Sequence, residues 1–161
     1  MSMIVTADTL PRRIFADDAD LAALVAEFEA CIITKAEWSH FTHLAVAAGT
    51  VHRDGIQAAR RDIPARIRAL NDANGVPNTD ERGYHETLTQ FFLLLVHRYL
   101  ATQPRDRSVA EAVNALPLSV FGDKNIAFRF YSRDLLLSVT ARRQWVDPDL
   151  RTLAYLASIT P

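Results

Sequence analysis

The 161-residue chain is poor in cysteine, since Cys31 stands alone and leaves no partner for an internal disulfide bond. A lone cysteine also excludes zinc sites built from several cysteines. An excess of charge of one sign is lacking too, because 18 Lys and Arg residues oppose 19 Asp and Glu residues, for a formal net charge of −1. General nucleic-acid binding needs a basic surface, so we expect no nucleic-acid partner.

Long hydrophobic runs are absent as well. The longest apolar stretch, residues 91–96, is far shorter than the roughly 20 residues that a membrane-spanning helix needs. Residues 1–13 lack the basic start and apolar core of a signal peptide, and no polybasic segment would attract a membrane surface. We therefore expect a cytoplasmic protein without a membrane partner.

The rest of the composition is that of an ordinary globular protein, with 49% hydrophobic and 23% charged residues. A chain of this length fits one domain with a real core. We predict a single helical domain over residues 1–161, which shows no internal repeat. Residues 1–16 should form an irregular N-terminal arm, and residues 149–161 should form a tail across the helices.

Apolar residues recur at spacings of three and four over four long stretches, which predicts four main helices. We expect these over about residues 18–32, 34–53, 56–74 and 83–102. Leu21, Leu24, Val25, Phe28 and Ile32 make the apolar stripe of the first helix. The predicted fold class is all-α, an antiparallel bundle of four main helices with short C-terminal helices.

Local signals mark several helix ends. Thr34 with Glu37, and Ser108 with Glu111, match the capping-box pattern at helix N-termini. Pro64 predicts a kink or a restart inside the third helix. Short helices are expected over about residues 108–116, 123–130 and 133–145.

Helical phase separates the five histidines into two groups. With about 100° per residue, His40 and His43 share the apolar side of the second helix, and His52 lies on its flank. On the fourth helix, His85 is aligned with the apolar stripe and His97 is not. The sequence thus predicts three inward imidazoles, His40, His43 and His85, near the N-terminal turns of two helices.

Such a cluster is typical of a metal site in a helical bundle, where side chains converge from facing helices. Three histidine ligands leave an open position at which zinc can activate water, and histidines with a carboxylate suit non-haem iron. We therefore predict a divalent metal, zinc, nickel or iron, held by His40, His43 and His85. Glu86 is the candidate ligand or catalytic base. Tyr84 and Thr89 should shape the pocket, and Asn78 should line its mouth.

Other functions fit the same residues. The histidines could form a structural hydrogen-bond network, because buried imidazoles cost free energy unless they find partners. The chain would then be a non-enzymatic ligand-binding or interaction module. A metal-free acid/base pair of His85 and Glu86 ranks last, since adjacent residues diverge on a helix. A small molecule is the expected partner, while a homodimer and an enzymatic activity are left open.

Two distinctive motifs are Trp38-Ser39-His40, followed by His43-Leu44, and Gly83-Tyr84-His85-Glu86-Thr87-Leu88-Thr89. Asn71, Gly75-Val76, Asn78-Thr79, Tyr131-Ser132-Arg133 and residues 145–150 accompany them. In these residues the chain, from about residue 28 to residue 150, resembles a family of small bacterial helical proteins of unassigned function. The resemblance implies a grouping and no activity.

A looser likeness in architecture is to the DinB-like metal-dependent bundles, which hold a divalent ion with three histidines. Those bundles usually place two histidines four residues apart on their last helix and one on an earlier helix. Here the pair His40 and His43 is early and three residues apart. This resemblance implies only the idea of a three-histidine metal site inside a bundle.

Overall fold

The computed structural model describes residues 13–161, and within this range it contains helices and no strands, which confirms the all-α class. The longer helices are α1 (Asp18–Glu29), α2 (His40–Asp54), α3 (Ile56–Ala73) and α4 (Glu86–Thr102). The shorter ones are α5 (Val109–Ala115), α6 (Arg133–Leu136), α7 (Val139–Arg143) and the 3₁₀ turns η1 (Leu116–Leu118), η2 (Val120–Gly122), η3 (Ile126–Arg129) and η4 (Leu153–Ser158).

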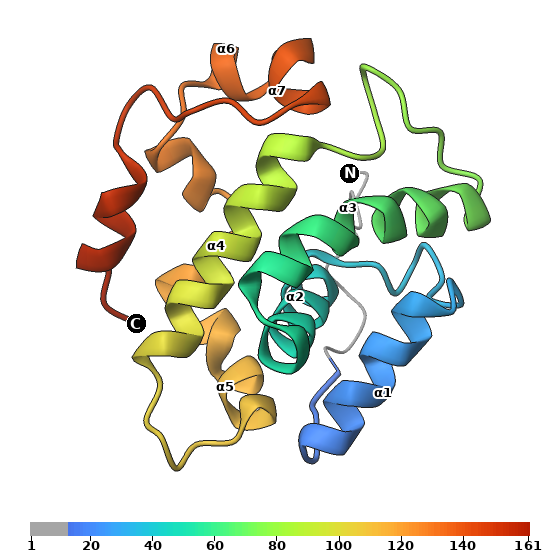
Figure 1. Ribbon diagram of the computed structural model, residues 1–161, viewed down its shortest axis with the longest axis vertical. Helices are drawn as coiled ribbons and strands as arrows, with labels where there is room; N and C mark the ends of the chain where they lie inside the picture. Colours follow the sequence, from blue (N-terminus) through green and yellow to red (C-terminus); the bar gives the residue numbers. More distant parts are fainter. Residues whose placement is uncertain (1–12) are drawn as a thin grey trace, which may run out of the picture.

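Helix α2 is the central element, because it packs against α1, α3, α4 and α5 (Figure 1). Its eight consecutive residues 44–51 are all buried, as expected for a helix surrounded by other elements. Small residues allow the close approach: a Cβ atom added at Gly49 would lie 2.6 Å from Cγ2 of Val25 on α1. Helix α3 also packs against α4, and this places three helices around a common interior.

The C-terminal segments cover α4, because both α7 and η4 pack against it. Arg98 on α4 donates to the carbonyl of Ala157 at 2.9 Å, so the expected tail lies along this helix. At the other end of the chain, buried Phe15 exchanges backbone hydrogen bonds with the Asn114 side chain at 3.0 and 2.9 Å. The rest of the predicted N-terminal arm, residues 1–12, lies outside the described residues.

Several predicted helix ends were wrong. Helix α1 stops at Glu29, because Cys31 adopts a left-handed φ of 57°, and Ile32 is therefore 65% exposed instead of in the stripe. Thr34 and Glu37 form a separate turn, in which the Thr34 hydroxyl donates to Glu37 at 2.6 Å, and α2 begins only at His40.

Two further helix predictions had different outcomes. Helix α3 continues through Pro64, so the chain does not restart there. The capping box of Ser108 and Glu111 is confirmed at the start of α5. In residues 13–161, no helix has both the length and the apolar character needed to cross a bilayer.

Candidate functional site

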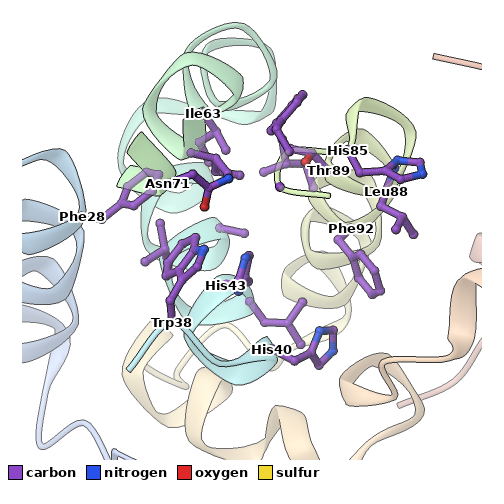
Figure 2. Close-up of a pocket in the computed structure, with 17 residues that line it drawn as sticks. Phe28, Trp38, His40, His43, Ile63, Asn71, His85, Leu88, Thr89 and Phe92 are labelled. Carbon is purple, nitrogen blue, oxygen red and sulfur yellow. The ribbon is translucent and has the colours of Figure 1, made fainter. Parts of the chain in front are cut away.

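A cavity of about 440 Å³ lies between α2, α3, α4 and the segment that leads into α4 (Figure 2). Its wall is mainly apolar and includes the aromatic rings of Phe28, Trp38, Tyr84 and Phe92. The described wall residues include no Asp, Glu, Lys or Arg. The polar side chains of the wall are therefore few, and their orientation decides what the cavity can bind.

An aromatic stack positions His43 in this wall. The Trp38 ring is stacked on Phe28 at a centroid distance of 5.3 Å. The His43 ring packs against Trp38 at a centroid distance of 3.8 Å. Ser39 caps α2 by accepting a hydrogen bond from the backbone N–H of Thr42 at 3.2 Å. This cap fixes the first turn of α2, from which His43 extends into the cavity.

The protonation of His43 is set by its partner on the backbone. Its Nδ1 atom lies 2.7 Å from the carbonyl oxygen of Ser39, and a carbonyl oxygen can only accept. Nδ1 therefore carries the proton, and Nε2 presents a lone pair. Burial, with a smaller contribution from the nearby His40, lowers the pKa of His43 to about 4, so the ring is neutral at pH 7.

Asn71 on α3 is the second polar group of the wall, and it is only 8% exposed. The backbone N–H of Tyr84 donates to Oδ1 of Asn78 at 3.0 Å, which fixes this oxygen as an acceptor. Asn71 must therefore direct its Nδ2 toward the same oxygen, at 2.9 Å. Its own Oδ1 is left facing the cavity, as Figure 2 shows.

His85, predicted as a metal ligand, makes two hydrogen bonds to the backbone in this structure. It precedes α4 as the N-cap, where Nδ1 accepts from the backbone N–H of Leu88 at 3.2 Å. Its Nε2 donates to the carbonyl of Leu136 at 2.9 Å, and Figure 2 shows the ring directed away from His43. Burial lowers the pKa of His85, so the neutral ring uses both nitrogens in these bonds.

Glu86 lies behind the wall of the cavity. Its carboxylate accepts from the Tyr84 hydroxyl at 2.6 Å and from Gln90 at 3.0 Å. Burial and the bond to Glu86 both raise the pKa of Tyr84, so its hydroxyl stays protonated. Tyr84 and Thr89, predicted to shape the pocket, line the cavity. Asn78, expected at the mouth of the cavity, is not in the wall and instead accepts a hydrogen bond from Asn71.

The three predicted metal ligands all border this cavity but do not meet at one point. In residues 13–161, no three His, Cys, Asp or Glu side chains are placed to share a metal ion. The His40 ring packs edge-on against Phe92 at a centroid distance of 5.1 Å, and His85 already uses both of its nitrogens. As placed here, His85 has no lone pair for a metal ion.

Trp38, which packs against His43, and Asn71, a polar residue of the wall, were not predicted as site residues from the sequence. The signal for Asn71 was present: it is a polar residue four positions after Ile67 and eight after Ile63, on the buried face of α3. A buried amide on an apolar stripe needs partners, and that need can mark a site. Trp38 lies within the predicted helix 34–53 but precedes α2 in the structure, so helical phase does not apply to it.

Comparisons of the chain with protein-family models, with curated proteins and with solved structures gave no match. The resemblance to the bacterial family therefore stays a prediction. The candidate site depends on the geometry of this chain alone.

Proposed function

We propose that the chain is a small-molecule-binding protein whose ligand occupies the cavity between α2, α3 and α4. The observation that carries this proposal is the size and lining of the cavity, about 440 Å³ and mainly apolar. Ligand pockets are typically roughly 300–1,000 Å³, apolar, and supplied with a few placed polar groups. Protein interiors otherwise contain few voids larger than a water molecule.

The wall suits binding better than a reaction. It offers aromatic surface and two hydrogen-bond acceptors, Nε2 of His43 and Oδ1 of Asn71. Glu86, the predicted base, has both carboxylate oxygens bonded behind the wall. We therefore assign a binding function and no reaction step.

Filling the cavity tests this function. Ala47 lies in the wall and is 7% exposed, so Ala47→Leu adds three carbon atoms to the space a ligand needs. We expect neutral naphthalene-sized probes to bind the wild type in calorimetric titrations. Ala47→Leu should lower their affinity at least about tenfold, because losing the burial of two ligand carbons costs over about 1.4 kcal/mol.

The control is Ala22→Leu, which adds the same atoms at an exposed position of α1 outside the wall. This variant should bind the probes as the wild type does. If no probe binds the wild type, or if Ala47→Leu binds them undiminished, the cavity is not the binding site.

A metal-binding function is the second candidate, because His40, His43 and His85 border the same cavity. It requires His85 to release Leu136 or Leu88 before it can act as a ligand. The ligand-binding proposal predicts far less than one equivalent of zinc, nickel or iron on untagged, desalted protein after incubation. A stoichiometric ion, measured by mass spectrometry and lost in His85→Ala, would instead support the metal centre.

A further inference from the structure

We infer that the cavity selects an uncharged ligand with an apolar, aromatic-sized body and a hydrogen-bond donor, a hydroxyl or an N–H group. The donor would bind between Nε2 of His43 and Oδ1 of Asn71. This inference rests on the proposed function, because it names the ligand class of the same site. It depends on three observations about the wall.

The first observation is that His43 can only accept in the cavity. The Ser39 carbonyl holds the proton on Nδ1 at 2.7 Å, so the lone pair lies on Nε2. No hydrogen bond to Nε2 occurs within residues 13–161. A ligand with a donor would form a hydrogen bond with this atom. A purely apolar ligand would displace water from it and leave the acceptor without a hydrogen bond, which costs free energy.

The second observation is that Asn71 is also fixed as an acceptor. Two backbone groups fix the orientation of these amides: the Tyr84 N–H donates to Oδ1 of Asn78, and Nδ2 of Asn78 donates to the Arg68 carbonyl at 3.3 Å. Because Asn78 cannot flip, Asn71 cannot flip either, and its Oδ1 stays toward the cavity. Figure 2 shows this oxygen and the His43 ring approaching the same space from two helices.

The third observation concerns charge. Two basic groups contact wall residues without bordering the cavity. Arg68 stacks on the Tyr84 ring at 3.9 Å, and Arg142 donates to the Tyr84 carbonyl at 3.1 Å. A buried carboxylate or phosphate would therefore find no described cation in the wall, and an ammonium group would find no carboxylate. Burial of an unpaired charge is costly, so the ligand is uncharged.

A matched set of probes tests this ligand class. We would titrate the wild type at pH 7 with 2-naphthol, 2-methoxynaphthalene and 2-naphthoate, which share one apolar body and differ in the polar group. We expect naphthol to bind about fivefold tighter than the methyl ether, the worth of one net hydrogen bond, and naphthoate to bind most weakly. Equal binding of naphthol and the ether, or tightest binding of naphthoate, would overturn the inference.

His43→Phe locates the acceptor. Phenylalanine keeps a ring against Trp38, and the Ser39 carbonyl keeps its bond from the backbone N–H of residue 43 at 3.0 Å. The preference for naphthol should disappear, mainly because the ether gains affinity once it no longer buries an unpaired acceptor at position 43. Should this variant fail to fold, Asn71→Leu offers the same test from the other wall.

The outcomes separate the two proposals. If the ether binds but naphthol gains nothing, the ligand class is wrong and the binding function stands. If none of the three probes binds, the proposed function fails and this inference fails with it. A preference for naphthol that survives in both variants would show that neither acceptor selects the donor.

Discussion

Gly83→Ala is expected to lower the free energy of unfolding by about 3–4 kcal/mol, the sum of backbone strain and overpacking. Gly83 has a φ of 82°, which L residues rarely adopt. A Cβ atom here would also overlap the carbonyl oxygen of Pro77 and lie 2.9 Å from Cα and Oδ1 of Asn78. The clash would displace the amide that orients Asn71, so the variant should also lose its preference for donor ligands.

Gly75→Ala is the matched control for this prediction. Gly75 has a similar φ of 67°, but a Cβ atom there would meet no atom within 4 Å. It should therefore show only the backbone cost, about 1–2 kcal/mol. Urea unfolding followed by circular dichroism measures both variants. Equal losses would mean that the close approach around Gly83 does not matter.

The second large effect is a loss of stability in acid that depends on His43. Its folded pKa is about 4 and its ordinary value is 6.5, so between these values the unfolded chain binds a proton that the folded chain does not. Stability is therefore complete above pH 6.5 and falls as the pH drops toward 4. The loss reaches about 3 kcal/mol at most, since each unit of pKa is worth about 1.4 kcal/mol.

His43→Phe should remove most of this loss, because phenylalanine does not titrate. A smaller acid loss should remain in the variant, since burial also lowers the pKa of His85. His52→Gln, at an exposed position of the same helix, is the control and should follow the wild type. Urea midpoints between pH 4 and pH 7.5 provide the measurement, and an unchanged slope in His43→Phe would contradict the role of His43.

The sequence predicted the helical class and separated the histidines correctly by burial. His52 and His97 are exposed, and His40, His43 and His85 border the cavity, as the apolar stripes indicated. These features depend on local periodicity, which reflects the burial of each helix face. Periodicity is a property of short stretches, and a single chain shows it directly.

The detailed site could not be predicted because it depends on where each helix begins and on contacts across the fold. His85 was placed by helical phase, yet α4 starts one residue later, so that phase does not apply to it. A histidine cap is not among the usual N-cap residues, which are Ser, Thr, Asp and Asn. The bond from His85 to Leu136 spans 51 residues, and no local pattern contains it.

The dual bonding of His85 ties the cavity to a part of the chain that does not border it. Every described wall residue precedes residue 94, yet His85 holds the Leu136 carbonyl and the neighbouring Thr87 hydroxyl donates to Gln144 at 2.9 Å. A ligand that binds only when the wall is intact would stabilise the contacts of His85 and Thr87 with the C-terminal segment. Local opening of α6 and α7 would therefore be slower in the bound protein. Ligand binding in the interior would thus affect the C-terminal helices through the bonds of His85 and Thr87.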